Sequence, residues 1–483
     1  MKKISILLIT IITLIIWRPI ASQVPMGEGY YYFEKCQMQL TPSEDCASSL
    51  KQFDNLARIS FKVMTGFFKD DLGMYMYSQI ATMLLLYITF YLVLLKVTKN
   101  NAFALFTTIF FLSNHTGSFS MMATGNYQRF AQRVPNLIPM LISFSFFVKY
   151  MDKKRIVDLI LFYLLFVGSL FLAHHGIFLL PLFIVYALVK TFSQKLTTKT
   201  IITPAMLILS IIVIAKIITG ADHFVPKQNL FEFTTSTPHI FEKTVLQIPN
   251  LIIPSGITKF IATELVSPPL PYPFTNILRF WAIILAPLFL FTIYSLKNKS
   301  DIALLFRTAV FALPIVSLLN LYAYGDGTPD PLRNFGEDRI YFVSSIFSSL
   351  IVGTYSYLAW TGGKMISKII VATILILYVT YNAILIGIGS NNIKPNSTKM
   401  ETFITYTRAN IANPNFKIAI IGPSHLLWPE LFLSNFYNTN DNLLFILDST
   451  DWLKSLDLNH WNKIVIVDYN DKEPGKIIEK IIK

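Results

Sequence analysis

Charged residues are scarce in this chain of 483 residues: Asp, Glu, Lys and Arg make up 14% of it, whereas hydrophobic residues make up 53%. A soluble protein carries about 25% charged residues, so the composition excludes an ordinary water-soluble globular protein. Phenylalanine is frequent, with 40 residues, and the apolar runs are about twenty residues long, enough to cross a hydrocarbon core about 30 Å thick. The sequence therefore predicts a polytopic integral membrane protein.

Acidic residues are the scarcer of the two charged classes: 28 Asp and Glu stand against 41 Lys and Arg, which gives a net charge of +13. A basic excess can indicate a nucleic-acid-binding protein. Here, however, the Lys and Arg residues form short clusters between apolar runs, which is the pattern of the positive-inside rule. We therefore expect membrane lipid, and no nucleic acid, as a partner.

Cysteine is nearly absent, with two residues in the chain. Both Cys36 and Cys46 lie in one polar segment that we predict to be extracytoplasmic, where an oxidising compartment allows a disulfide between them. Two free thiols are the other interpretation, and the sequence leaves both open.

The apolar runs predict about eleven transmembrane helices. The first run follows Met1-Lys2-Lys3, and we interpret it as an uncleaved helix because a small-residue cleavage site is missing; a signal peptide is the alternative. Two runs are separated only by His174-His175-Gly176, which predicts a tight helical hairpin. The predicted helices lie near residues 4–22, 78–96, 102–121, 134–150, 156–173, 175–191, 200–219, 276–296, 303–323, 339–360 and 366–388.

Basic residues mark every second connection between these helices, and this alternation predicts the orientation. The N-terminus is expected on the cytoplasmic side, and the C-terminal part outside. The basic clusters are Lys2, Lys3; Lys96, Lys99; Lys149, Lys153, Lys154, Arg155; Lys190, Lys195, Lys199; Lys297, Lys299; and Lys364, Lys368. The expected outer segments are 23–77, 114–133, 174–175, 220–275, 324–338 and the chain after about 390.

The predicted fold is mainly α: a transmembrane domain, residues 1–390, followed by a small extracytoplasmic α/β domain, residues 391–483. The outer loop 23–77 should contain short helices near 45–68, and the Pro-rich loop 220–275 should lie along the membrane surface or fold over a cavity. In the tail, short buried-strand patterns alternate with helical patterns, which is typical of a parallel α/β domain. The strands are expected at 417–422, 443–447 and 463–468, and the helices at 399–412, 424–435, 450–457 and 474–482.

Acidic residues in the first outer loop are candidate catalytic groups. Glu28 follows the first helix closely and precedes Tyr30-Tyr31-Tyr32, so a rigid helix would tether it at the membrane interface. A carboxylate there can act as a general base toward a nearby hydroxyl. Glu34 and Asp54 are weaker candidates in the same loop, and a solvated loop glutamate is the alternative interpretation of Glu28.

Basic side chains at the outer face are candidate phosphate-binding groups. Arg129 and Arg133 lie four residues apart, on one helical face, in a segment, 114–133, that contains no acid. A guanidinium binds phosphate in a bidentate manner. His174 and His175 at the outer hairpin could bind a phosphate, whereas their adjacent positions do not suit a metal site. Contact with lipid headgroups and polar capping are the alternatives.

Arg339 and Tyr341 open a late apolar helix, and we expect Arg339 to bind phosphate. The preceding Asp326 and Asp330 lie among Gly and Pro residues, which favours a turn over a calcium site. In the tail, the stretch Gly422-Pro423-Ser424-His425 matches neither a phosphate loop nor a nucleophile elbow. The tail is therefore expected to be non-catalytic.

This layout resembles the GT-C superfamily of membrane glycosyltransferases, and the resemblance covers nearly the whole chain as an architecture. The matching features are a cytoplasmic N-terminus, Glu28 in the first large outer loop, His174-His175 at an outer hairpin, Arg339 with Tyr341 opening a late helix, and an outer C-terminal domain. The resemblance implies an integral membrane enzyme of the cell envelope. Such an enzyme moves a hexosyl or pentosyl group from a polyprenyl-phosphate donor to a glycan, lipid or protein acceptor.

The resemblance also implies a mechanism and the roles of the site residues. Glu28 takes the position of the family's first acid, and Arg339 with Tyr341 takes that of the element near the lipid phosphate. Segment 114–133 lacks the second acid that members often have, so a metal-independent lipid monophosphate donor fits best, and no metal or cofactor is expected. The implied reaction is an inverting displacement on the extracytoplasmic face, in which Arg and His groups stabilise the departing phosphate.

Other functions stay as alternatives. An O-antigen polymerase or ligase is also polytopic and has outer arginines, but it usually lacks a folded C-terminal α/β domain. A transporter or flippase typically shows broken helices near mid-membrane and internal repeats, and we find no repeat in the sequence. A catalytically inactive scaffold of the same fold is a third alternative.

Overall fold

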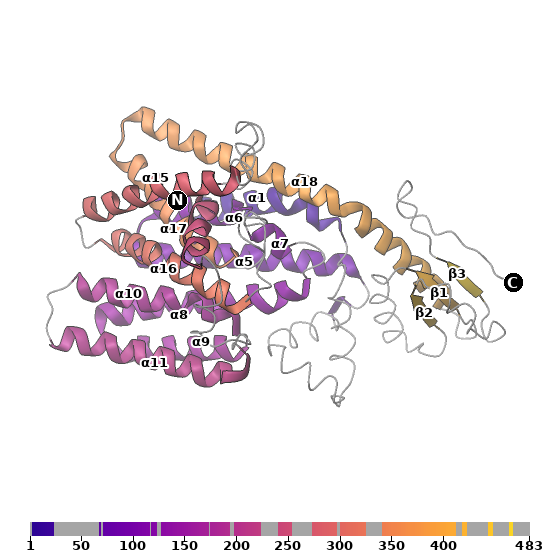
Figure 1. Ribbon diagram of the computed structural model, residues 1–483, viewed down its shortest axis with the longest axis horizontal. Coiled ribbons are helices and arrows are strands. Elements are labelled where there is room, and N and C mark those ends of the chain that lie inside the picture. The colour runs from indigo at the N-terminus through magenta and orange to yellow at the C-terminus, as the bar shows by residue number, and fades with distance from the viewer. Residues whose placement is uncertain are drawn as a thin grey trace. The chain divides into compact units, whose positions relative to one another are not determined.

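The computed structural model covers the whole chain and describes most of its helices (Figure 1). The predicted sites at Cys36 and Cys46, most of the helical stretch 45–68, and the tail helices at 424–435, 450–457 and 474–482 lie outside the described residues. The described residues are 2–23, 67–68, 71–115, 117–122, 127–172, 174–193, 198–223, 240–253, 273–296, 300–324, 341–411, 418–422, 443–447 and 463–466.

The described part of the chain is mainly helical, and every apolar run predicted from the sequence coincides with a helix. Short helices α7 and α13 and the 3-10 helix η2 connect or flank the long ones. The helices are α1 (Lys2–Ala21), α5 (Leu72–Thr98), α6 (Asn101–Ser113), α7 (Ser118–Met122), α8 (Tyr127–Lys153), α9 (Ile156–Leu172), η2 (His174–Leu179), α10 (Leu180–Phe192), α11 (Thr198–His223), α13 (Ile240–Ile252), α15 (Pro273–Ser295), α16 (Asp301–Tyr324), α17 (Ser344–Gly362) and α18 (Met365–Ile411).

Seven helices of the described part are long and apolar enough to cross a membrane. Many large apolar side chains on them face outward; on α18, for example, Ile366 is 69% exposed and Leu377 is 62% exposed. Such surfaces need lipid rather than water, so the chain is a multi-pass membrane protein. The seven spans are Lys2–Ala21, Gly73–Thr98, Arg133–Lys153, Ile201–Ile218, Ile277–Tyr294, Asp301–Tyr322 and Met365–Pro395, and the shorter apolar helices are Asn101–Ser113, Ile156–Phe171 and Gly176–Phe192.

Two helices differ from their predicted extents. The helix predicted at 102–121 ends at Ser113, because Asn114 is extended (φ −67°, ψ 114°) and Gly117 has a positive φ of 75°. The helix predicted at 366–388 continues as α18 to Ile411 and absorbs the separate helix predicted at 399–412. Hydropathy drops near residue 390, but the backbone hydrogen-bond ladder does not depend on side-chain polarity and continues.

The chain divides into two compact units. Unit 1 contains most of the helices, and unit 2 contains the three strands. Unit 1 comprises Met1–Ile16, Thr82–Met121 and Arg133–Ile386, and unit 2 comprises Trp17–Ala81, Met122–Gln132 and Gly387–Lys483.

Aromatic packing and close helix crossings hold unit 1 together. Rings of α8, α9 and α10 form one cluster; for example, Phe147 and Phe183 meet edge to face at 5.3 Å between ring centroids. Helices α6 and α17 pack against each other, and a Cβ atom on Gly353 would lie 2.1 Å from Thr107 Oγ1. Small residues permit such close backbone approach where lipid replaces water and the hydrophobic effect between helices is weak.

One end of unit 1 gathers the connections that the sequence marks as basic. The Lys190 ammonium forms an ion pair with Asp152, which joins the ends of α10 and α8. Asp301, the first residue of α16, interacts electrostatically with both and with Lys99 of the α5–α6 connection. Because the groups of four connections meet here, the alternation of basic residues corresponds to one physical end of the bundle.

Uncharged contacts extend the same end of unit 1. The side chain of Asn100 caps α6 by accepting the N–H of Phe103 at 3.0 Å, and its amide donates to Tyr357 near the end of α17 at 3.0 Å. Ser5 of α1 donates to Asn101 at 3.3 Å. The start of α1, the start of α6 and the end of α17 therefore lie together.

Unit 2 contains a three-stranded parallel sheet, and its strands coincide with the strand patterns predicted from the sequence. The strands are β1 (Ile418–Gly422), β2 (Leu443–Leu447) and β3 (Lys463–Ile466), in the order β2-β1-β3. Within the same unit the Gln23 amide, just past α1, donates to the Ser390 carbonyl of α18 at 2.9 Å. Ser390 Oγ in turn donates to the Pro19 carbonyl at 2.9 Å, so α18 lies beside the end of α1.

Candidate functional site

The structure describes the predicted site residues in different detail: some not at all, some by their backbone only, and some with their side chains. Glu28, Asp54 and Arg339 lie outside the described residues. The backbone of Arg129 lies in the first turn of α8, and the backbones of His174 and His175 form the start of η2. Arg133 and Tyr341 are described with their side chains, and both are buried, at 6% and 2% exposure.

The predicted helical hairpin is present: α9 ends at Leu172, η2 makes the turn, and α10 follows from Leu180. Pro181 lies in the first turn of α10, where its missing N–H costs no helical hydrogen bond. The two histidines therefore lie at the turn of the hairpin, as expected from the sequence.

Tyr341 lies against the connection between α6 and α7. A Cβ atom on Gly117 would lie 2.5 Å from the backbone nitrogen of Phe342 and 2.8 Å from the carbonyl carbon of Tyr341. Only glycine allows this approach, and its φ of 75° is also one that other residues rarely adopt. The start of α17 is thereby held against the residues that follow α6.

His115 is an ionisable residue of this connection between α6 and α7. Its backbone N–H donates to Asn382 Oδ1 of α18 at 3.1 Å, and its ring stacks on Phe119 at 5.3 Å. The ring is buried, and burial lowers the pKa of His115 to about 4. The imidazole is therefore neutral at pH 7, and its Nδ1 has no hydrogen-bond partner in the part of the chain that the structure describes. We call His115, Gly117, Tyr341 and Asn382 the His115 cluster.

Serine-rich sequence shapes the helix that follows Tyr341. Ser345 and Ser349 donate their hydroxyls to backbone carbonyls one turn back, at 2.5 and 2.7 Å, which satisfies them in an apolar bundle. Ser344 instead accepts the amide of Asn320 from α16 at 2.9 Å. This bond ties the end of α16 to the start of α17, one turn from Tyr341.

Arg133 belongs to a second group of polar residues, on α8. One turn later on the same face, Asn136 accepts the Ser169 hydroxyl of α9 at 2.6 Å. A Cβ atom on Gly176 of η2 would lie 2.9 Å from Asn136 Nδ2, so η2 crosses α8 closely here. Arg133 itself interacts with other groups of the protein. We call Arg133, Asn136, Ser169 and Gly176 the Arg133 cluster.

Helix α16 connects the two clusters, because η2 packs against it and because its Asn320 reaches the start of α17. The His115 cluster lies at the end of α6 and the start of α17, whereas the basic connections lie at the opposite ends of the same two helices. The structure thus brings Arg133, the histidine hairpin and Tyr341 into one end of unit 1.

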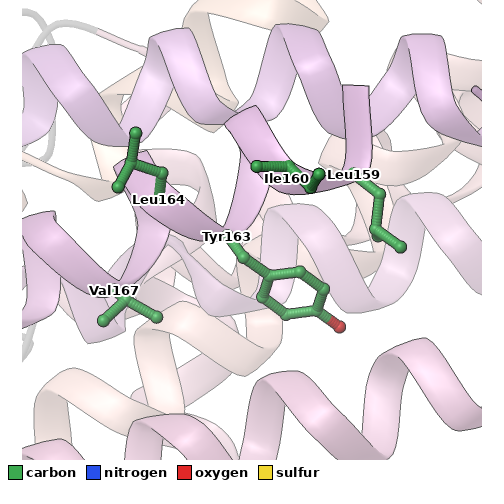
Figure 2. Close-up of a pocket in the computed structure, with 5 residues that line it drawn as sticks. All are labelled: Leu159, Ile160, Tyr163, Leu164 and Val167. Carbon is green, nitrogen blue, oxygen red and sulfur yellow. The ribbon is translucent and has the colours of Figure 1, made fainter. Parts of the chain in front are cut away.

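A surface groove of unit 1 is mainly apolar, in contrast to the two polar clusters. It has a volume of about 420 Å³ and is lined by Leu159, Ile160, Tyr163, Leu164 and Val167, all from α9. Figure 2 shows these side chains on one side of the helix, with the Tyr163 ring extending toward a neighbouring helix. The Tyr163 hydroxyl bonds to Ser210 of α11. Four of the five lining side chains are aliphatic, and the Tyr163 hydroxyl is bonded to Ser210, so the open groove suits a lipid chain better than acid–base chemistry.

His115, Asn320 and Asn382 did not emerge from the sequence as site residues. The signal that could have found them is a polar residue inside or directly after an apolar run, because such groups are costly in a membrane. Among the described residues, no three His, Cys, Asp or Glu side chains gather in a group that could hold a metal ion. No model of a known protein family and no curated protein matches this chain in sequence.

Proposed function

We propose that this protein is a membrane glycosyltransferase of the GT-C type, which transfers a sugar from a polyprenyl-phosphate donor to an acceptor at the extracytoplasmic face. The observation that carries the proposal is the gathering of Tyr341, His115 and the Arg133 cluster at the end of unit 1 opposite to the basic connections. By the positive-inside rule the basic end is cytoplasmic. The polar clusters then face the outer interface, where a lipid-linked donor can reach them while its tail stays in the bilayer.

The proposal includes eleven spans, with the N-terminus inside and the C-terminal part outside. The helices that coincide with the eleven predicted runs include α17, which is less apolar than the seven long spans. Its serines bond to its own backbone, so its polarity is compatible with a place inside the bundle. The parallel sheet β2-β1-β3 is the core of the proposed outer α/β domain.

In the proposed reaction, Glu28 takes the proton of the acceptor hydroxyl while the oxygen attacks the anomeric carbon. The bond between that carbon and the donor phosphate oxygen breaks, and the configuration inverts. Arg339, Arg133 and Arg129 stabilise the leaving phosphate as cations. His115 is neutral, so it would serve as a hydrogen-bonding group beside Tyr341 rather than as a charge.

The order of the residues along α1 supports the role of Glu28. The start of α1 is bonded to Asn101 at the basic end, and Glu28 follows the other end of this twenty-residue helix in the sequence.

The test is transfer from radiolabelled polyprenyl-phosphate sugars by the purified full-length protein. General-base assistance is worth roughly 10²–10⁴-fold, so Glu28→Gln should lower the transfer rate by about that factor while donor binding persists. Glu34→Gln removes the charge of the weaker candidate six residues along the same segment, and it should keep the wild-type rate; loss of transfer in Glu34→Gln alone would make Glu34 the base. If Asp54→Asn abolishes transfer and Glu28→Gln does not, Asp54 is the base. If neither change matters in an active protein, the mechanism is wrong.

A further inference from the structure

Helix α13 lies in the outer segment 220–275, for which the sequence predicted no helix. It precedes α15 and packs against α15, α16 and α17. Because α16 and α17 carry Asn320 and Ser344, which tie them together one turn from Tyr341, α13 packs on the helices that build the proposed site.

The buried side of α13 contains a row of polar residues beside Leu246 and Leu251, which are 2% and 3% exposed. Thr244, Gln247 and Asn250 are 8%, 0% and 2% exposed, and they follow one another at intervals of three residues. That interval places them along one face of a helix. A surface helix normally turns its apolar stripe inward, so a buried row of a hydroxyl and two amides needs a specific reason.

Packing within the described part of the chain does not provide that reason. Neither atom of the Gln247 amide has a hydrogen-bond partner in the described residues, and the same holds for Asn250 Oδ1. Buried polar groups almost always find a partner, and leaving one without a partner costs about 1–3 kcal/mol. Two amides with such atoms on one face indicate that the face binds a partner outside the described residues.

Helix α16 contributes matching groups. Ser317 is fully buried, and its hydroxyl has no hydrogen-bond partner among the described residues. It lies one turn before Asn320, whose amide donates to Ser344. These groups and those of α13 are uncharged donors and acceptors, which match hydroxyl groups, whereas phosphate and cations need charge.

We infer that the polar face of α13, through Gln247 and Asn250, binds the hydroxyl groups of the donor's sugar, with Ser317 of α16 as a further contact. The inference rests on the proposed function and adds the part of the site that selects the sugar. The phosphate would be held by the arginines and the sugar by uncharged amides, so the two parts of the donor can be tested separately.

The test measures the thermal unfolding midpoint of the purified full-length protein with two kinds of probe. One is farnesyl phosphate, and the other is a series of farnesyl phosphates that carry glucose, galactose, mannose, N-acetylglucosamine or arabinose. At least one sugar-bearing probe should raise the midpoint further than farnesyl phosphate does. Gln247→Leu and Asn250→Leu should lose that extra rise, with affinity falling about 3- to 10-fold for each amide, and should keep the rise caused by farnesyl phosphate.

The unliganded protein gives a second signature. Replacing an amide that has no partner with leucine removes a burial penalty, so the midpoint of Gln247→Leu should not fall and should rise by about 1–3 °C. Gln79→Leu on α5 is the matched control, because that amide is equally buried and equally without a partner in the described part of the chain. It should show the same rise and keep the wild-type response to the sugar.

The outcomes separate the inference from the proposed function. If Gln247→Leu keeps the extra rise with the sugar, the face holds water alone, and the inference fails while the glycosyltransferase stands. A fall of several degrees in the unliganded midpoint would show a structural amide, with the same consequence. If no sugar adds to the effect of farnesyl phosphate on the wild-type protein, the inference also fails. If farnesyl phosphate has no effect either, the proposed function falls with it.

Discussion

The two ends of unit 1 differ in their buried polar groups: one end has a paired charge, and the other has uncharged groups without hydrogen-bond partners in the described residues. At the basic end, Lys190 is buried but paired with Asp152, and Asn100 both accepts from Phe103 and donates to Tyr357. Each of these groups is satisfied by the chain itself, although Tyr186 Oη and Arg307 Nε at the same end have no hydrogen-bond partner in the described residues. A satisfied network fixes helix ends and has no need of a ligand.

At the other end and on α13, uncharged polar atoms are buried without partners in the described residues: His115 Nδ1, the Gln247 amide, Asn250 Oδ1 and Ser317 Oγ. Such atoms lower stability, and natural proteins retain destabilising groups mainly where function requires them. The comparison therefore assigns the Asp152–Lys190 pair to structure and topology, and the His115 cluster and α13 to binding.

The largest effect is expected at Gly117. In Gly117→Ala the new Cβ would lie 2.5 Å from the Phe342 nitrogen, against backbone that cannot turn away, and φ is 75°. We expect the start of α17 to be displaced, a loss of more than about 3 kcal/mol of stability, and loss of donor binding. The measurements are the folded yield and the unfolding midpoint in detergent.

Gly168→Ala is the matched control for that change. Gly168 lies in α9 with no heavy atom within 4 Å of its Cβ position, and alanine is the better helix former by about 1 kcal/mol. The control should be neutral or slightly stabilising. Equal behaviour of the two variants would mean that the close approach at Gly117 does not hold the site together.

The second prediction tests the basic end. Asp152→Asn removes the ion-pair partner of the buried Lys190 ammonium and leaves only the electrostatic interaction with Asp301. Breaking a buried pair costs about 3–5 kcal/mol, and because Asp152 is 46% exposed we expect about 2–3 kcal/mol here. The additional change Lys190→Met should restore most of the loss. The measurement is the unfolding midpoint, with Lys153→Met, on an exposed neighbour, as the control.

Transfer activity per folded molecule should be unchanged in Asp152→Asn if the basic end is purely structural. A strong loss of activity in protein that is still folded would contradict the division of roles between the two ends.

The sequence was sufficient for the features that depend on local composition. Each long apolar run became a helix, because about twenty apolar residues leave little alternative in a membrane. The strand patterns at 417–422, 443–447 and 463–468 coincide with β1, β2 and β3, because short runs rich in Ile, Leu and Val favour a buried parallel sheet. The position of the His174-His175 turn followed from the same local signals.

The features that the sequence did not predict depend on contacts between distant segments. The break after α6 is fixed by the backbone of Tyr341 and Phe342, more than two hundred residues away along the chain. Helix α13 contains Pro249 and lies among other prolines, so it looked like a loop; its packing on α15, α16 and α17 decides otherwise. The burial of His115 is likewise a property of the bundle and not of residues 101–122.

The smallest predicted effect concerns the pH dependence at the His115 end. Burial lowers the pKa of His115 to about 4, against about 6.5 in an unfolded chain. Between these two values the unfolded chain binds more protons than the folded protein, so stability falls as the pH falls through this window and levels off below pH 4. At pH 5 the loss relative to pH 7.5 should be on the order of 2 kcal/mol.

His115→Gln removes the titration and keeps a polar side chain, so its unfolding midpoint should decline less than that of the wild-type protein between pH 7.5 and pH 5. The backbone N–H of residue 115 donates to Asn382 in either case, so the contact with α18 is expected to persist. The basic end offers the contrast, because the Asp152–Lys190 ion pair contains no histidine. Asp152→Asn keeps His115, so its midpoint should decline between pH 7.5 and pH 5 as much as that of the wild-type protein. Identical pH profiles for His115→Gln and the wild-type protein would show that the imidazole is not held neutral at this end of the bundle. The contrast between the paired charges of the basic end and the unpartnered uncharged groups would then rest on α13 and α16 alone.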